Sequence, residues 1–245
     1  MEGLEDQAAA EAQILIKRLA THRVLEVKHS SRDRLMEIIT DALISSSSVP
    51  GSEIITRSIV FRSGLSLASL RRVQTALNQP HSPIIEIEFV GLRSTEEIAL
   101  ALDCCRQQHV AIRRLRLENY RPTGRLSHED REDVARVLRD GIFGEDSLLG
   151  DDSKEPLPLV TCMELVRYPI GAIGAKVLTD AVSANKSIEI LRLLDCDLRS
   201  DSMYYVAEMI RRNTFLQELD LSYNRHYLGS PLTREITIKT LVKKG

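Results

Sequence analysis

One spacing of apolar residues recurs five times along this chain: an apolar residue, two others, a second apolar residue, one other, and a third apolar residue. The five triplets are Ile84, Ile87, Phe89; Ile112, Leu115, Leu117; Val160, Met163, Leu165; Ile188, Leu191, Leu193; and Leu216, Leu219, Leu221. Their first residues lie 28, 48, 28 and 28 residues apart, and 48 is one period of 28 plus an insertion of 20. A degenerate copy, Thr56, Ile59 and Phe61, lies 28 residues before the first. A fixed period of this length predicts a solenoid, because each unit can bury its apolar side only against its neighbours.

Each triplet ends with two apolar residues at a spacing of two, which favours a short β-strand. Amphipathic stretches with helical spacing lie between the triplets. Ser94 to Glu97 has the form of a capping box that opens one helix, Ser127 and Asp130 open a second, and a third starts near Ser200. This alternation predicts an α/β fold with parallel strands on one side and helices on the other.

The composition is ordinary for a folded protein, with 43% hydrophobic and 28% charged residues. A formal charge of −2 gives no basic field to recruit nucleic acid or an anionic membrane, and aromatic residues are scarce. No apolar run is long enough to span a membrane, and the N-terminus lacks the pattern of a secretory signal. The cysteines show no disulfide-like spacing, so we expect free thiols and a cytoplasmic location, in the cytosol or the nucleus. They are Cys104, Cys105, Cys162 and Cys196.

Residues 170–198 contain the most regular unit. Gly171 and Gly174 stand where the strand side turns into the helix, and Asn185, where the helix ends, is repeated 28 residues later by Asn213. This unit resembles the ribonuclease-inhibitor-type leucine-rich repeat. The resemblance implies a leucine-rich-repeat solenoid of about six to seven 28-residue repeats, with a curved parallel sheet on the concave side and helices on the convex side.

The same resemblance assigns a role to the ninth position of the strand motif, where that family has Asn or Cys. The side chain there bonds the backbone of the turn, and Asn224 and Cys196 fit this position. Leu92, Tyr120 and Tyr168 occupy it in other units.

We expect a single leucine-rich-repeat domain over 1–245, with its repeats in 51–228. Residues 1–50 contain two helical stretches around a short apolar run at Val24. They are expected to form an N-terminal cap, or an irregular repeat that begins at Val24, 32 residues before Thr56. A coiled-coil or partner-helix role is the alternative for this segment.

Two further segments lie outside the repeat register. The insertion at 141–158 holds five acidic residues and one Lys, and it lacks the alternating Asp pattern of a calcium loop. It is expected to be a solvated surface loop, with docking to a basic partner as the alternative. Residues 229–245 are expected to form a C-terminal cap and tail, starting like a helix at Ser230 and Pro231.

No motif with catalytic or cofactor-binding spacing is found. The phosphate-binding loop, the dinucleotide-binding glycines, the zinc-protease helix and the serine-nucleophile elbow are all missing, and the histidines are scattered. We therefore expect a protein that is not an enzyme and has no cofactor or metal.

Side chains alternate along a strand, so the residue between the last two apolar positions of each triplet faces away from the helices. In chain order this column reads Val60, Glu88, Arg116, Glu164, Arg192 and Asp220. The column two residues earlier reads Ser58, Glu86, Arg114, Cys162, Ile190 and Glu218. Neighbouring strands lie about 4.8 Å apart, so acid and base alternate in the first column. Either the charges neutralise one another, each pair contributing ~0.2–1 kcal/mol, or they form a polar strip that orients a protein partner.

The leading hypothesis is a non-catalytic protein-binding or scaffold subunit acting through the concave face, for example in a cytoskeletal or other multi-protein assembly. Its partner is expected to be a protein, with no nucleic acid, membrane or small-molecule cofactor. The alternative is a regulator of an enzyme, because the ribonuclease inhibitor and the GTPase-activating protein for Ran are built on this repeat. The candidate protein-binding residues are Glu88, Arg116, Glu164, Arg167, Arg192, Leu194, Asp220 and Tyr223.

Overall fold

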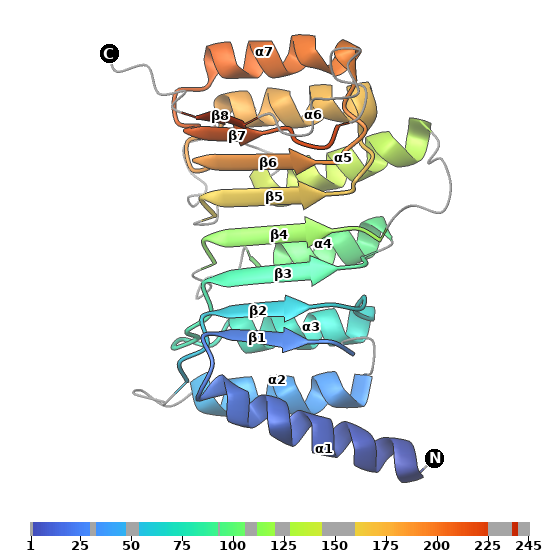
Figure 1. Cartoon of the computed structure of the whole chain (residues 1–245), viewed down its shortest axis with the longest axis vertical. Coiled ribbons are helices and arrows are strands. Elements are labelled where there is room, and N and C mark those ends of the chain that lie inside the picture. The colour runs from blue at the N-terminus through green and yellow to red at the C-terminus, as the bar shows by residue number, and fades with distance from the viewer. Residues whose placement is uncertain are drawn as a thin grey trace. The chain divides into compact units, whose positions relative to one another are not determined.

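The computed structural model describes residues 2–29, 33–47, 54–92, 94–105, 112–120, 128–143, 160–224 and 237–239. Helices and parallel strands alternate along these residues, so the predicted α/β class is confirmed (Figure 1). The chain divides into two compact units, unit 1 (1–115) and unit 2 (116–245). The expectation of one domain over 1–245 stays a prediction. None of the described helices is both long and apolar enough to cross a membrane.

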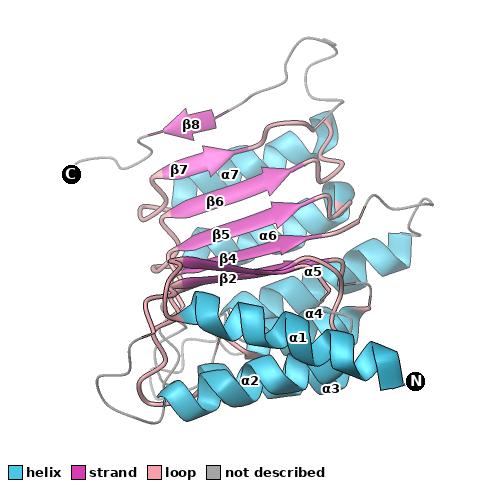
Figure 2. Ribbon diagram, turned by 60° about the horizontal axis from the view of Figure 1, so that its bottom comes forward, coloured by secondary structure: helices cyan, strands magenta, loops and turns pink. Residues whose placement is uncertain are grey.

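The strands of unit 1 follow one another in the sheet in chain order, and helices lie on one face of that sheet (Figures 1 and 2). Ile59 and Phe61 lie opposite Ile87 and Phe89, and the two phenyl rings stack with centroids 5.5 Å apart. The elements of unit 1 are α1 (Glu2–Leu19), β1 (Val24–Val27), α2 (Asp33–Ser47), β2 (Ser58–Phe61), α3 (Leu67–Leu77), β3 (Glu86–Val90), α4 (Thr95–Asp103) and the start of β4 (Arg114–Glu118). The predicted capping box is present: Ser94 Oγ accepts from Glu97 N at 3.1 Å, and the Glu97 carboxylate accepts from Ser94 N at 3.3 Å.

The register at the N-terminus differs from the sequence-based expectation. Val24 lies opposite Ser58 and is 52% exposed, whereas Leu25 and Val27 are buried. The unit that aligns with Thr56 therefore begins at His22, 34 residues earlier, and the expected start at Val24 is wrong. Val24 is apolar but points outward, because side chains alternate along the strand and the deeper positions fix the register.

In unit 2 the apolar triplets again lie in register, with Met163, Leu191 and Leu219 side by side on parallel strands. Its elements are the rest of β4, α5 (His128–Phe143), β5 (Cys162–Val166), α6 (Gly171–Ala184), β6 (Ile190–Leu194), the 3₁₀ turn η1 (Ser200–Ser202), α7 (Met203–Arg212), β7 (Glu218–Asp220) and β8 (Thr237–Lys239). The helix expected near Ser200 thus begins with a 3₁₀ turn.

Both expected irregular segments of unit 2 are only partly described. Helix α5 continues to Phe143, so residues 141–143 are helical and not part of a loop, and residues 144–158 lie outside the described residues. The helix start expected at 230–231 also lies outside them. Thr237–Lys239 form β8, which pairs antiparallel with β7 and so covers one edge of that strand.

The turn after the strand has the same backbone conformation in successive repeats of unit 2. Arg167, Asp195 and Tyr223, each 28 residues from the next, have φ values of 58°, 54° and 65°. In unit 1 the equivalent residue is Gly91, with φ of 85°. A residue with a side chain in this left-handed region costs about 1–2 kcal/mol, so the repeat imposes a conformation that these three residues do not prefer.

Gly171 is the residue at which α6 must begin without a side chain. Its φ is +62°, and a Cβ there would lie 2.9 Å from Nη1 of Arg131. Gly174 permits close packing of two helices, since its Cβ would lie 3.2 Å from that of Ala135 on α5. The predicted turn into the helix at these glycines therefore has a steric reason.

Two asparagines that lie 28 residues apart form hydrogen bonds with the backbone of the segments that connect a helix to the following strand. Asn213 Oδ1 accepts from the backbone N–H of Phe215 and Leu216, and its Nδ2 donates to the carbonyls of Val182 and Asn185. Asn185 Oδ1 accepts in the same way from the residues that follow it. Its buried Nδ2 has no acceptor among the described residues.

Asn224 and Cys196 bond the backbone of the turn, as predicted. Asn224 Oδ1 accepts from Cys196 N at 2.8 Å, and its Nδ2 donates to Leu193 O at 2.7 Å. Cys196 Sγ contacts the equivalent carbonyl one repeat earlier, Leu165 O, at 3.4 Å. Burial raises the pKa of Cys196 to about 12, although a hydrogen bond from the backbone of Tyr168 acts in the opposite direction. The thiol therefore acts as a protonated donor.

The two buried asparagines provide a matched test of this backbone bonding. Asn→Asp keeps the side-chain acceptor but removes the amide donor. Asn213→Asp loses both donated bonds and places a carboxylate beside two carbonyls, so we expect the free energy of unfolding to fall by about 2–4 kcal/mol. Asn185→Asp loses no bond, so its loss should be smaller by at least about 1 kcal/mol. Urea unfolding of both variants measures the difference, and equal losses would contradict the assignment.

Candidate functional site

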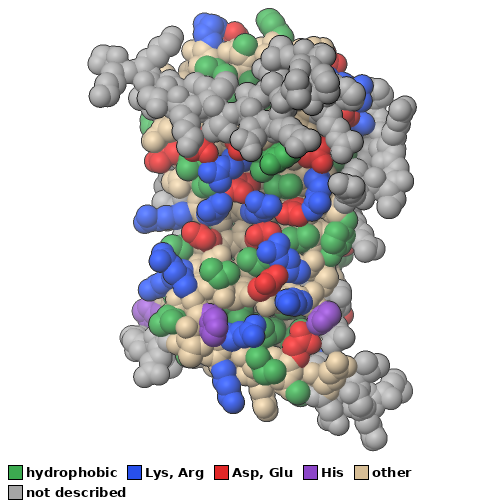
Figure 3. Space-filling model, in the orientation of Figure 1, with side chains coloured by type: hydrophobic (Ala, Val, Ile, Leu, Met, Phe, Trp, Pro, Cys, Tyr) green, Lys and Arg blue, Asp and Glu red, His purple; other side chains and the backbone are tan. Residues whose placement is uncertain are grey.

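The candidate site lies on the face of the unit 2 sheet that no described helix covers, which we call the open face (Figure 2). Met163, Leu165, Leu191 and Leu193 are buried beneath the helices. Because side chains alternate along each strand, the residues between them point to the open face. Basic and acidic side chains are interspersed on the side of the molecule that Figure 3 shows.

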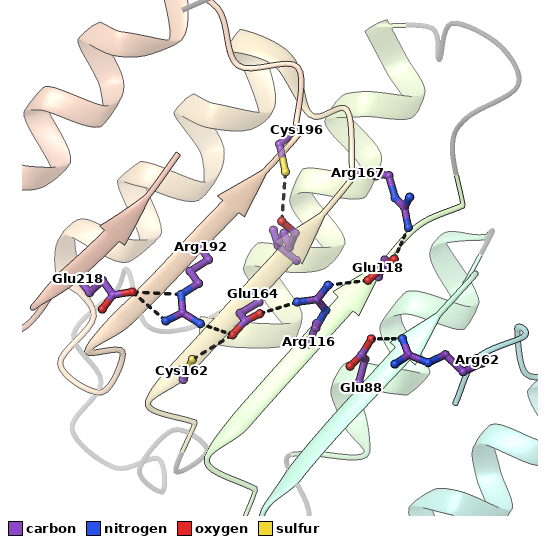
Figure 4. Close-up of polar contacts among 11 residues, drawn as sticks. Arg62, Glu88, Arg116, Glu118, Cys162, Glu164, Arg167, Arg192, Cys196 and Glu218 are labelled. Carbon is purple, nitrogen blue, oxygen red and sulfur yellow. Dashed lines mark hydrogen bonds and ion pairs between the residues drawn. The ribbon is translucent and has the colours of Figure 1, made fainter. Parts of the chain in front are cut away.

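Six charged side chains on this face form one continuous chain of ion pairs, which we call the open-face network (Figure 4). Base and acid alternate along it, with three arginines and three glutamates. The order is Arg167, Glu118, Arg116, Glu164, Arg192 and Glu218.

Glu164 lies at the centre of the network and is only 1% exposed. One carboxylate oxygen accepts from Arg116 Nη1 at 3.0 Å and the other from Arg192 Nη1 at 2.7 Å. The thiol of Cys162 lies 3.8 Å from the second oxygen. A buried carboxylate is tolerated when its charge is neutralised and its oxygens accept hydrogen bonds, and the two guanidinium groups meet both requirements.

The ends of the network are held by paired contacts. Arg192 donates from Nε and Nη2 to one oxygen of Glu218, at 3.1 and 2.8 Å. Arg116 Nη2 donates to Glu118 at 2.7 Å, and Arg167 donates to the other oxygen of Glu118. Burial acts to lower the pKa of Arg192, but the hydrogen bonds and charges of Glu218 and Glu164 outweigh it and raise the pKa above its ordinary value.

Two members of the network were not among the predicted site residues. Glu118 lies two residues after Arg116 on the same strand, and Glu218 lies two residues before Asp220, so both point to the open face. The period-two rule could have found them. The second column already contains Glu218, but the predicted ladder follows the first column, which overlooks pairs along a strand and on the diagonal.

Asp220 does not pair with Arg192, although its place in the column predicts this pair. It lies opposite Arg192 in the register, but Arg192 bonds Glu218. Asp220 Oδ1 instead accepts from the backbone N–H of Ser222 at 2.9 Å and from its hydroxyl. The short Asp side chain favours its own turn, whereas the longer Glu reaches the neighbouring strand.

Glu88 lies in unit 1 and takes part in a separate set of ion pairs. Arg62 donates to Glu88 at 2.9 Å and to Glu26 at 2.8 Å. Arg62 follows β2 directly and was not predicted as a site residue. One arginine thus bridges two glutamates on the sheet face of unit 1.

The residues expected to be exposed at the strand ends differ in their surroundings. Arg167 is half-buried in the network, and Leu194 is half-buried opposite Val166. Tyr223 is 54% exposed. The open face of unit 2 therefore combines a neutral, ordered polar strip with a half-buried apolar pair and one exposed aromatic ring.

Few features of the described residues favour a metal site, a reactive thiol or a ligand cavity. They contain no group of His, Cys, Asp and Glu side chains that could hold a metal ion. Burial raises the pKa of Cys104 well above its usual value and that of Cys105 to about 12, and such thiols are poor nucleophiles. A cavity between β5, β6 and α6 has only about 10 Å³ and apolar walls, so it is a packing gap.

Known protein-family models do not match this chain, and neither does any curated protein sequence.

The central position of Glu164 leads to a prediction about stability. Glu164→Gln leaves two half-buried guanidinium groups facing a neutral amide, and we expect a loss of about 3 kcal/mol in the free energy of unfolding. Glu218→Gln removes a more accessible carboxylate that bonds one arginine of the network, so its loss should be below about 1 kcal/mol. Urea unfolding of both proteins tests this, and equal losses would show that Glu164 is not the centre of the network.

Proposed function

We propose that the chain is a non-catalytic protein-binding or scaffold subunit of the leucine-rich-repeat class, and that it binds its partner through the open face of unit 2. The observation that carries this proposal is the charge-balanced network of six side chains on a face without a covering helix. Its arginines and glutamates are already held in place by one another, so a partner would order few further side chains on binding.

A protein partner suits this face better than a strongly charged ligand. The network has no net charge, whereas nucleic acid would require an excess of basic residues. Arg and Tyr are the residues that most often dominate protein interfaces, and an apolar pair beside a polar strip resembles the centre and rim of such an interface. Tyr223, Leu194 and Arg192 are then the main contacts of the proposed site.

The leucine-rich-repeat assignment is supported by local geometry that recurs with the period. The 28-residue spacing reappears in the left-handed turns, in the two helix-ending asparagines and in the backbone bonds of Cys196 and Asn224. A curved sheet of six to seven repeats is part of the proposal.

The buried thiols and the lack of a metal cluster in the described residues support a non-catalytic role. Free, buried cysteines also suit a reducing compartment, so we propose a cytoplasmic location within a multi-protein assembly, for example a cytoskeletal one.

Tyr223→Gly tests binding without the usual ambiguity about folding. Gly relieves the positive φ, so the variant should be at least as stable as the parent, with a gain of up to about 1 kcal/mol. Its affinity for the partner should fall about thirtyfold if Tyr223 is a hot spot of 2 kcal/mol or more.

The experiment is quantitative affinity capture with mass spectrometry, followed by titration of the protein that is captured. Tyr204→Ser is the matched control, because Tyr204 is an aromatic residue on α7 with 73% exposure. The proposal holds if a captured protein is lost with Tyr223→Gly and with Leu194→Glu and is retained with Tyr204→Ser. Capture of the same proteins by all four chains would refute it.

A further inference from the structure

A second surface, in unit 1, has the opposite character to the network. Arg23, Arg57 and Arg113 each stand directly before a strand, at the first, second and fourth of four successive equivalent positions, and Ile85 holds the third. The backbone fixes this alignment: Arg57 N donates to Arg23 O at 2.8 Å, Ile85 N to Arg57 O at 2.9 Å, and Arg113 N to Ile85 O at 2.7 Å. We call these three residues the arginine row.

All three side chains of the arginine row are exposed. The side chain of Arg57 donates to the carbonyl of Pro83, and no acidic side chain in the described parts of the chain pairs with Arg23 or Arg57. Neighbouring strands lie about 4.8 Å apart, so the like charges of Arg23 and Arg57 are close together, and Arg113 stands two strands from Arg57. In the open-face network every arginine instead bonds at least one glutamate.

The same position in unit 2 shows that the repeat does not require arginine there. It holds Thr161, Glu189 and Gln217, which are linked by the same backbone bonds of 2.8 and 2.7 Å. The row is therefore a property of this surface of unit 1 and not of the fold.

Further basic side chains extend the row. Ile55 N and Thr56 N donate to Leu19 O, which brings the end of α1 to the start of β2. The last turn of α1 carries Lys17 and Arg18, both exposed.

Two exposed apolar side chains lie within this basic surface. Val24 follows Arg23 directly and is 52% exposed, and Ile55 lies two residues before Arg57 and is 48% exposed. Single-stranded nucleic acid is usually bound by aromatic stacking in addition to phosphate contacts, and Val24 and Ile55 are aliphatic. A polypeptide with carboxylates and an apolar side chain matches both features.

We propose that the arginine row, with Val24 and Ile55, binds an acidic segment of a partner polypeptide in extended form. Alternate side chains of an extended segment lie about 7 Å apart on one face, which the flexible arginines can reach from strands about 4.8 and 10 Å apart. The carboxylates pair with the guanidinium groups, and an apolar side chain contacts Ile55 or Val24.

The probe is a short labelled peptide with Glu at alternate positions and one central Leu, and binding to the full chain is followed by fluorescence anisotropy. Arg23→Glu combined with Arg57→Glu should weaken binding at least about tenfold. Lys28→Glu combined with Arg71→Glu is the matched control: both residues are exposed in unit 1, and the change in charge is the same. It should change the affinity less than about twofold, and added salt should weaken binding of the parent chain.

Unchanged thermal unfolding of both double variants confirms that folding is intact. Equal loss in the control pair, equal binding of a Gln-for-Glu peptide, or displacement by a single-stranded oligonucleotide at lower concentration than by the peptide would each overturn the proposal. Tyr223→Gly should bind the peptide like the parent, so this result is independent of the proposed function of unit 2.

Discussion

The registered burial of the apolar triplets is the constraint on which the rest of each unit depends. When Leu191 lies between Met163 and Leu219, the residues that point to the opposite face are also fixed in line, about 4.8 Å apart. Buried or half-buried charges at that spacing are favoured when they alternate in sign, because like charges side by side oppose the packing that aligns them. Glu164, between Arg116 and Arg192, is the clearest example. Burial of the core residues on its strand fixes the position of its carboxylate, and the two guanidinium groups neutralise its charge there.

The sequence predicts the features that depend on the 28-residue period. It misses the features that depend on how far each side chain extends. The triplets and the capping box at Ser94 follow from spacing, the bonds of Asn224 follow from the resemblance to a known repeat, and the structure confirms them. Spacing could not show that Arg192 would bond Glu218 and not Asp220, because side-chain length and the competing turn decide that choice. The error at Val24 has a related cause: an apolar residue at a strand start does not show which of two registers buries more.

The two proposed surfaces show how one backbone supports different electrostatics. The open-face network is neutral and internally paired, so its contribution to binding lies in shape, order and the neighbouring Leu194 and Tyr223. The arginine row carries like charges, and no acidic side chain of the described residues pairs with Arg23 or Arg57. Its contribution lies in attraction over about a Debye length, which salt weakens. The first surface should therefore be insensitive to salt and the second sensitive to it, so ionic strength separates their partners.

The left-handed turns give an independent reason to place function at Tyr223. At Arg167, Asp195 and Tyr223 the turn after the strand has a positive φ, and glycine adopts this conformation without cost, as at Gly91. Asp195 and Arg167 are polar, and Arg167 also gains an ion pair with Glu118. Tyr223 has neither property: its ring is mostly exposed and still accepts a cost of about 1–2 kcal/mol. A strained residue with an exposed aromatic ring is best explained by a contact made outside its own unit. The ring follows β7, the strand that carries Glu218 of the network.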